Sequence, residues 1–358
     1  MSEIHRPVEH RLRSELEALA AADDGPRPDG WALSPRAVRR FVLGDPVLGI
    51  DQKFYGDDPL VDRCLVTLMG NRGLLLVGEP GTAKSMLSEL FAAAISGDST
   101  LIAQGTAGAT EDQLLYSWNY AMLIANGPSE QALVPGPILT GMRAGKLVRV
   151  EEITRMQAEV QDALISVLSD RHLSIPQLDE AGVVGARRGF NVIATANLRD
   201  RGVHEMSSAL KRRFNFETVR PIADPALERT LISAQTDRLL ADAGVAVVTP
   251  PDVIELLVTV FNELRSGVTG EGVVVERPTA VMSTAEAVAV GYAAALDAHF
   301  LGAGVPTGRQ IGRQLIGTVL KDNPDDEAKL RHYLDAVVKK RGGPWADLWQ
   351  VRGELSRR

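Results

Sequence analysis

A short glycine-rich turn in this sequence carries the residue types that bind phosphate groups. Glycines let backbone N–H groups approach an anion closely, and a helix that follows adds the positive end of its dipole. A lysine at the end of such a turn reaches the β- and γ-phosphates of a nucleotide, and a serine after it offers its hydroxyl to Mg²⁺. The residues of the turn are Gly78, Glu79, Pro80, Gly81, Thr82, Ala83, Lys84 and Ser85.

The turn departs from the usual pattern at one position. The residue before Lys84 is ordinarily glycine, and here it is Ala83. Alanine adds only a methyl group, so we expect the loop to survive if the backbone angles permit it. A chance turn before a helix is the alternative, but here an apolar strand, two landmark glycines and a Lys-Ser pair occur together. The turn therefore predicts a phosphate-binding loop that takes ATP and Mg²⁺ as cofactors.

Two adjacent acids supply the second half of the chemistry that such a loop requires. They are Glu151 and Glu152, and they follow the apolar segment 147–150. In P-loop ATPases, the first acid of such a strand holds the water shell of Mg²⁺, and the second polarises the attacking water. We therefore assign Glu151, together with Ser85, to the metal and Glu152 to catalysis. Without the loop, solvated acids at a strand edge would be the better interpretation.

The elements that must position these residues are visible as alternating apolar runs and amphipathic segments from about Lys53 onward. Residues 74–77 predict the strand before the loop, and residues 85–95 predict the helix after it. Continuous apolar runs of this kind are typical of strands that helices bury on both faces. Further strands are predicted at 101–103, 147–150, 191–195 and 216–219. The pattern predicts an α/β fold with a parallel sheet.

Both ends of the chain have a helical pattern. Residues 7–22 place apolar residues at helical spacing, residues 23–30 predict a linker, and Ser34 with Pro35 predicts the start of a second helix. After residue 225 the strand signals largely stop, which predicts a smaller all-α domain. The expected domains are an N-terminal helical extension (1–48), a nucleotide-binding α/β domain (49–222), and a helical lid domain with a C-terminal tail (223–358).

Composition limits the classes of function. The formal net charge of −7 gives no overall basic field, so binding to nucleic acid is not favoured. Cys64 is the single cysteine and lies in an apolar run, which predicts a buried thiol and fits a reducing compartment. The chain opens without the apolar core of a secretory signal, and charged residues interrupt its most apolar stretch, 280–301. We expect a cytoplasmic protein that does not enter the membrane.

Several motifs, taken in order, resemble the MoxR family of AAA+ ATPases. The resemblance is good over about 49–219 and loose over the helical remainder. It implies a three-layer αβα sandwich around the parallel sheet, followed by a smaller all-α lid domain. The motifs are the loop Gly-Glu-Pro-Gly-Thr-Ala-Lys-Ser, Pro135-Gly136-Pro137-Ile138-Leu139, Ile153-Thr154-Arg155-Met156, the helix 161–168, Ile193-Ala194-Thr195-Ala196-Asn197, and Ala209-Leu210-Lys211-Arg212-Arg213-Phe214.

The resemblance implies roles for further residues. Asn197 matches the sensor-1 residue that orients water against the γ-phosphate. Arg213 matches the arginine finger that a subunit inserts into the ATP site of its neighbour, where it neutralises developing charge. Arg212 is the alternative finger, although a solvated basic turn also explains it. The family usually has Ser-Pro-Arg at the start of a lid helix for sensor 2, and here Arg277 precedes the proline instead. Arg277 is expected either to reach the γ-phosphate of ATP or to serve as a helix-end charge or surface salt bridge.

Two segments resemble insertions of the family. Residues 105–136 match a helical insertion that projects over the central surface of the ring, and its aromatic residues either contact a client or pack into a core. Residues 173–188 match the β-hairpin that precedes sensor 1. At the C-terminus, Trp345 and Trp349 lie one helical turn apart, which favours packing on the lid over partner docking.

The resemblance implies a homo-oligomer, by default a hexameric ring, with ATP at the subunit interfaces. Such ATPases commonly act on a protein client, often with a partner that carries a von Willebrand factor A domain. A DNA-acting AAA+ ATPase is one alternative, and the acidic charge counts against it. A slow nucleotide switch is another, since Glu151 is one methylene longer than the usual aspartate.

Overall fold

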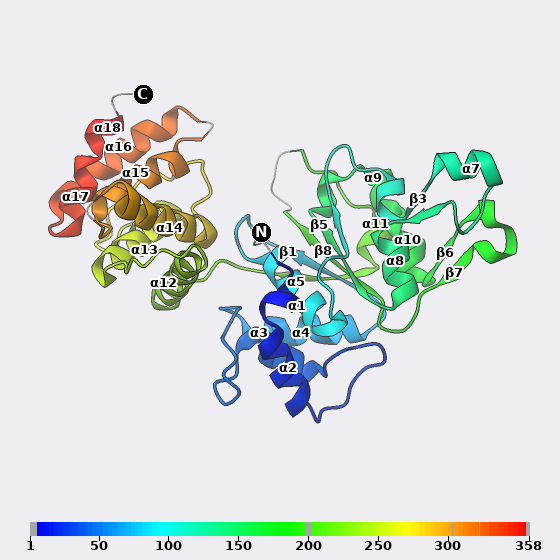
Figure 1. Cartoon of the computed structure of the whole chain (residues 1–358). Coiled ribbons are helices and arrows are strands. Elements are labelled where there is room, and N and C mark those ends of the chain that lie inside the picture. The colour runs from blue at the N-terminus through cyan, green and yellow to red at the C-terminus, as the bar shows by residue number, and fades with distance from the viewer. Residues whose placement is uncertain (1–5, 198–201, 303, 322, 356–358) are drawn as a thin grey trace. The chain divides into compact units, whose positions relative to one another are not determined.

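The structure is a computed structural model that describes residues 6–197, 202–302, 304–321 and 323–355. The chain divides into two compact units, and the main boundary lies between Arg220 and Pro221. The first unit contains a sheet with helices, and the second contains helices (Figure 1). The predicted division into residues 1–48, 49–222 and 223–358 stays a prediction.

The main sheet of the first unit has five parallel strands in the order β2-β5-β8-β1-β9. Each strand overlaps a predicted apolar run, so the prediction of an α/β fold with a parallel sheet is confirmed. The middle strands β5, β8 and β1 are buried along their whole length, which explains their continuous apolar sequences. The strands are β1 (Gly73–Val77), β2 (Ile102–Gln104), β5 (Leu147–Glu151), β8 (Asn191–Ala196) and β9 (Phe214–Thr218).

Two apolar cores, one on each face of the sheet, make the three-layer sandwich that the family resemblance implied. Leu74 and Leu76 of β1 belong to one core, and Leu75 and Val77 belong to the other, because successive side chains point to opposite faces. The first core includes residues of α3 (Pro35–Leu43), α4 (Asp58–Met69) and α5 (Lys84–Ser96). The second includes residues of α8 (Pro137–Ala144), α10 (Leu164–Ser169) and α11 (Ser208–Lys211).

The N-terminal helices share the first of these cores. The single helix predicted over 7–22 is divided at Leu12 into α1 (Val8–Arg11) and α2 (Arg13–Ala22). Val8 and Leu19 are buried in the same cluster as residues of β1 and α5, and Cys64 is buried there too. Helix α3 begins as predicted, since the Ser34 hydroxyl accepts a hydrogen bond from the Ala37 N–H at 3.2 Å.

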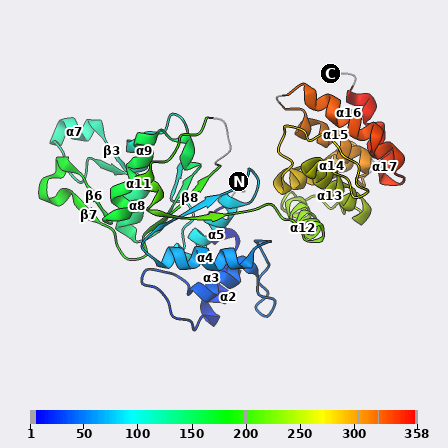
Figure 2. The ribbon, with the colours of Figure 1, turned by 180° about the vertical axis from the view of Figure 1, so that it is seen from behind.

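Two antiparallel hairpins extend the first unit. The first pairs β3 (Tyr116–Trp118) with β4 (Leu133–Pro135), and helices α6 (Glu111–Leu114) and α7 (Tyr120–Asn126) accompany it. The second pairs β6 (His172–Ser174) with β7 (Val183–Gly185) across η2 (Pro176–Gly182), which confirms the hairpin predicted over 173–188. Helix α7 and the β6–β7 hairpin lie at the same end of the unit in both ribbon views (Figures 1 and 2).

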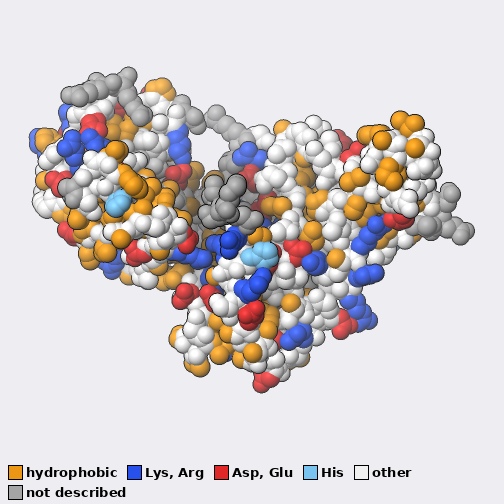
Figure 3. Space-filling view, in the orientation of Figure 1, with side chains coloured by type: hydrophobic (Ala, Val, Ile, Leu, Met, Phe, Trp, Pro, Cys, Tyr) orange, Lys and Arg blue, Asp and Glu red, His pale blue; other side chains and the backbone are white. Residues whose placement is uncertain are grey.

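Apolar side chains gather on the surface of the first unit where α7 lies (Figure 3). Tyr120 and Ile124 of this helix are 69% and 86% exposed, whereas Trp118 packs partly buried against the second core. The packing alternative therefore holds for Trp118, and contact with a client stays a prediction for the exposed residues of α7. One aromatic residue belongs to the core, and another faces solvent.

The second unit is helical, as predicted. Its described residues form no strand, although an isolated bridge joins Val268 and Val274. Trp345 and Trp349 pack against its main core, so the packing interpretation of these residues is confirmed. None of the described helices is long and apolar enough to cross a membrane. The helices are α12 (Pro225–Asp242), α13 (Pro251–Ser266), α14 (Thr284–Phe300), α15 (Gly308–Val319), α16 (Asp325–Ala336), η3 (Val338–Lys340), α17 (Pro344–Gln350) and α18 (Arg352–Leu355).

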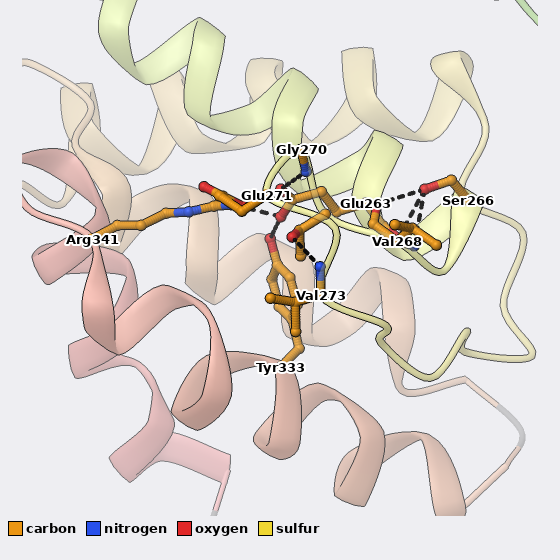
Figure 4. Close-up of polar contacts among 9 residues, drawn as sticks. Glu263, Ser266, Val268, Gly270, Glu271, Val273, Tyr333 and Arg341 are labelled. Carbon is orange, nitrogen blue, oxygen red and sulfur yellow. Dashed lines mark hydrogen bonds and ion pairs between the residues drawn. The ribbon is translucent and has the colours of Figure 1, made fainter.

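A buried carboxylate joins separate segments of this unit (Figure 4). Glu263 of α13 accepts hydrogen bonds from the Tyr333 hydroxyl at 2.6 Å and from two Arg341 nitrogens at 2.7 and 3.1 Å. Burial, together with the nearby Glu263 charge, raises the pKa of Tyr333. The Arg341 guanidinium also lies 4.3 Å from the ring centre of Trp345. The network holds α13 against α16 and the C-terminal segment.

Candidate nucleotide site

The carboxyl ends of three neighbouring parallel strands meet at one edge of the sheet. Val77 pairs with Ala196, so the loop that follows β1 lies beside Asn197, which follows β8. Val150 pairs with Ala194, which places the next residues, Glu151 and Thr195, side by side. Ligands of open α/β sheets bind at this edge. The register therefore brings the loop, the two acids and Asn197 together.

The loop contains two residues in the left-handed region of backbone space. Gly81 has a φ of 75°, and Ala83 has a φ of 66° with a ψ of 21°. Glycine adopts these angles freely, but a Cβ makes them unfavourable by about 1–2 kcal/mol. The chain thus accommodates alanine before Lys84 in a conformation that suits glycine. Helix α5 begins immediately afterwards, at Lys84, so its first N–H groups face the loop.

The Lys84 ammonium lies along its own loop. Its Nζ donates hydrogen bonds to the carbonyl oxygens of Gly78 at 3.0 Å and Glu79 at 2.7 Å. The Lys84 ammonium thus donates to backbone carbonyls the hydrogen bonds that it would otherwise donate to phosphate oxygens. A bound nucleotide would therefore exchange these hydrogen bonds for contacts with its phosphates.

The Glu151 carboxylate accepts hydrogen bonds at both of its oxygens. Its Oε2 accepts from Ser85 Oγ at 2.6 Å and Thr195 Oγ1 at 2.7 Å, and its Oε1 accepts from Ser88 Oγ at 2.6 Å and Arg149 Nη2 at 3.0 Å. Burial alone would raise the pKa of Glu151. The three hydroxyls and the Arg149 charge outweigh burial and lower this pKa below its usual value. Glu151 is therefore an ionised, buried acceptor.

The donor set fits a magnesium ion. A serine hydroxyl and a carboxylate are hard oxygen ligands of the kind that Mg²⁺ prefers when it also binds nucleotide phosphates. Ser85 and Glu151 Oε2 are already within hydrogen-bonding distance of each other. These two residues would hold the ion, directly or through its water shell.

Glu152 has a strained backbone and a side chain turned toward solvent. Its φ is 53° and its ψ is 46°, and its N–H donates to Thr195 Oγ1 at 3.0 Å. The carboxylate forms an ion pair with Arg155, and both side chains are close to half exposed. Left-handed non-glycine residues are concentrated at functional sites, where surrounding contacts hold them.

Gly105 explains how the backbone reaches this conformation. Its N–H donates to the Glu151 carbonyl at 2.7 Å. A Cβ at this position would lie 2.1 Å from the Glu152 carbonyl oxygen, so only glycine fits without displacement. The segment after β2 therefore packs directly against the backbone of the two acids.

Arg213 and Arg212 lie at the opposite edge of the sheet. Phe214 pairs with Gly73, so these arginines adjoin the amino end of β1, whereas the loop follows its carboxyl end. Arg213 donates to Ser169 Oγ at 2.7 Å and to the Ala209 carbonyl at 2.8 Å. Arg212 donates to the carbonyl of Ser208 at 3.2 Å. A five-residue strand spans about 16 Å, so Arg213 does not join the loop of its own chain.

Arg277 belongs to the helical unit. It lies in an irregular segment, and its guanidinium donates to the Ser266 carbonyl. The helix that follows, α14, begins at Thr284, and the Ser283 hydroxyl caps it by accepting from the Glu286 N–H. Arg277 is therefore several residues away from the helix start at which the resemblance places sensor 2. Its role stays a prediction.

The sequence did not single out three residues that surround Glu151, namely Arg149, Ser88 and Thr195. Arg149 could have been recognised from the sequence, because a charged residue inside a strand buried on both faces requires a partner. Glu151 is two residues away on the same face of that strand. Ser88 is one helical turn beyond Ser85 on α5, which was also visible from spacing. Thr195 became recognisable only from the register of β5 and β8.

Comparisons with known proteins agree with this architecture. Residues 73–214 match the family described as AAA domain (dynein-related subfamily), and residues 226–356 match the YehL-like AAA+ ATPase C-terminal domain. The crystal structure of NtrX from Brucella abortus in complex with ADP superposes with a TM-score of 0.51 and 13% identity, covering 85% of this chain and 68% of NtrX. At that identity the likeness shows the fold alone.

Two relatives identify the family. The protein YehL of Escherichia coli K12 is 51% identical over 346 residues, which cover 95% of this chain and 94% of YehL. Chaperone MoxR1 of Mycobacterium tuberculosis is 30% identical over 229 residues, which cover 62% of this chain and about half, 53%, of MoxR1. The chain therefore belongs to the MoxR-type AAA+ ATPases, within their YehL-like group.

Proposed function

We propose that this chain binds ATP together with Mg²⁺ and hydrolyses it as one subunit of an oligomeric motor. The observation that carries the proposal is the pairing of Ser85, the last loop residue, with Glu151 at 2.6 Å. This contact unites the loop and the acidic strand in one site. Bound Mg²⁺ would neutralise charge on the phosphates.

The residues of the site divide the work of phosphoryl transfer. Loop N–H groups and Lys84 bind the phosphates, and Ser85 with Glu151 hold the metal ion. Glu152 turns from Arg155 toward the nucleotide and accepts a proton from the attacking water. Asn197, at the end of the neighbouring strand, orients that water.

A neighbouring subunit completes the site in this proposal. Arg213 lies at the opposite edge of the sheet from the loop, and this placement supports a finger that serves another chain. Arg212 is the alternative finger, and Arg277 is the candidate contact from the lid. A ring, with a hexamer as the family default, places one such arginine at each interface.

Nucleotide binding and phosphate release test the proposal together. Lys84→Ala removes the cation that binds the outer phosphates, so it should abolish binding of a fluorescent ATP analogue. Glu152→Gln removes the base but leaves the binding groups, so it should retain ATP and release no phosphate. Tight binding by the first variant, or normal turnover by the second, would refute the assigned roles.

The motor's output would be the remodelling or maturation of a protein client in the cytoplasm. The name of chaperone MoxR1 supports a client that is a protein, and the family resemblance adds a partner with a von Willebrand factor A domain. The Glu152→Gln variant should retain such a partner when ATP is present and lose it when ATP is removed. Retention that does not depend on ATP would count against this role.

A slow nucleotide switch is the second candidate, and a specific observation favours it. The Glu152 carboxylate is ion-paired with Arg155, which competes with its work as a base. Steady-state phosphate release separates the candidates. A rate that Glu152→Gln abolishes supports the motor, and no measurable rate at high protein concentration supports the switch.

A further inference from the structure

Arg149 is a buried cation inside the apolar strand β5. It is 8% exposed and Glu151 is 3% exposed, and the two residues lie on the same face because they are two positions apart. Arg149 Nη2 lies 3.0 Å from Glu151 Oε1. Charged side chains are almost never buried unless they are paired. Arg149 and Glu151 are therefore buried as a pair, and the contacts around them indicate what Arg149 does for the carboxylate.

The guanidinium connects three segments around Glu151. Its Nε donates to Ser88 Oγ at 3.0 Å, its Nη1 to the Ser99 carbonyl at 3.0 Å, and its Nη2 also approaches the Ser85 carbonyl at 3.2 Å. A planar fork with donors on every nitrogen can make these contacts at once, and a lysine ammonium cannot. Arg149 thus holds β5, helix α5 and the segment before β2 around one carboxylate.

The contacts divide the two oxygens of Glu151 between two tasks. Oε1 is bound by Arg149 and Ser88, and Oε2 is bound by Ser85 and Thr195. Only Oε2 contacts the loop residue assigned to the metal. The longer glutamate side chain is therefore fixed with one defined oxygen toward the metal position, although aspartate is usual there.

We propose that Arg149 is the resident counter-ion and positioning residue of Glu151, so that the site is charge-balanced before Mg²⁺ arrives. A buried carboxylate without a cation is strongly destabilising. In a site without Arg149, Mg²⁺ would have to supply that charge. With Arg149 present, the fold does not depend on Mg²⁺, and the ion can leave with the spent nucleotide. This inference rests on the proposed Mg²⁺–ATP site.

Thermal unfolding without nucleotide tests the proposal, because it does not depend on ATP turnover. Unfolding of the full chain is followed in EDTA and in excess Mg²⁺, at about pH 8, where carboxylates are ionised. The wild type should show the same Tm in both, within about 1 °C. Arg149→Met should lower the Tm in EDTA by about 5 °C or more. Mg²⁺ should then restore about 3 °C or more of that loss.

Three further variants separate charge from packing. Arg149→Lys keeps the positive charge but lacks the planar guanidinium, so its Tm should fall. Because the charge is kept, its Tm should respond to Mg²⁺ as little as that of the wild type. Combining Arg149→Met with Glu151→Gln removes both charges, and should lose the Mg²⁺ response and part of the destabilisation. Arg143→Met, which breaks the exposed pair with Glu130, is the matched control and should change neither value.

Each outcome decides the matter. An Arg149→Met protein that is destabilised equally in EDTA and Mg²⁺ would show a packing role and overturn the proposal. If Arg149→Met does not fold, the double variant decides, since a folded double variant supports charge balance and an unfolded one contradicts it. ATP binding by the wild type is measured separately, so failure of the nucleotide site is distinguishable from failure of the counter-ion.

Discussion

At the scale of single residues, the site contains two non-glycine residues with left-handed backbones, Ala83 and Glu152. Their conformations differ in origin. Ala83 lies in the loop itself, where glycine is usual, whereas Glu152 is held by the Thr195 hydroxyl and by the close approach of Gly105. Strain of this kind persists where surrounding contacts determine the backbone. The two positions therefore respond differently to substitution.

Replacing Ala83 with glycine should stabilise the loop slightly. Glycine removes a penalty of about 1–2 kcal/mol for the left-handed conformation but adds about 0.5–1 kcal/mol of unfolded-state entropy. We expect the free energy of unfolding to rise by about 0.5 kcal/mol in denaturant titrations, with ATP binding retained. The control is Ala20→Gly in helix α2, which should lower the free energy of unfolding by about 0.5–1 kcal/mol. Equal losses in both variants would show that Ala83 is unstrained.

Gly105→Ala should damage the site without touching any catalytic side chain. The new Cβ would lie 2.1 Å from the Glu152 carbonyl and 2.8 Å from the Glu151 carbonyl, and both are backbone atoms that cannot rotate away. We expect a loss of about 1–3 kcal/mol in unfolding free energy and a fall in phosphate release. Gly108→Ala is the control, since no atom lies within 4 Å of its Cβ position. If the two variants behave alike, the close approach is unimportant.

At the scale of elements, the sequence predicted what local patterns determine. Strands β5, β8 and β1 were predicted because buried parallel strands are continuously apolar, and α3 was predicted because Ser34 and Pro35 mark a helix start. The division of the first helix at Leu12 left no such mark. The Arg149 network was not predicted either, because its contacts join β5 to α5 and β8 through tertiary packing. The loop and the two acids were predicted because they lie at or directly after the carboxyl end of an apolar strand, and Asn197 was predicted from the family resemblance.

The Glu263 network offers a test of what stabilises the helical unit. Glu263→Gln keeps the shape of the side chain but removes the charge that Arg341 and Tyr333 share. Breaking a buried pair in this way should lower the free energy of unfolding by about 3–5 kcal/mol, measured by denaturant titration. Glu255→Gln removes an exposed partner of Arg229 and should cost less than about 1 kcal/mol. Similar losses for the two variants would mean that the network is not a stabilising centre.

At the scale of the whole molecule, the opposite placement of the loop and Arg213 leads to a test of the proposed site shared by two chains. Arg213→Ala should leave ATP binding largely intact and lower turnover, because the loop is complete but the finger is missing. Mixing this variant with Glu152→Gln subunits should restore phosphate release. Interfaces that join an intact Glu152 to an intact Arg213 reappear at about a quarter of the sites in a random ring.

The control for the mixing experiment is a subunit that carries both substitutions. Mixed with Arg213→Ala subunits, it supplies no finger, so no interface becomes complete and no activity should return. Labelled subunits establish that the chains exchange, which makes a negative result meaningful. Exchange without recovered turnover would contradict a finger that acts between subunits. Recovery by single but not double variants would show that each chain supplies a residue to its neighbour's site.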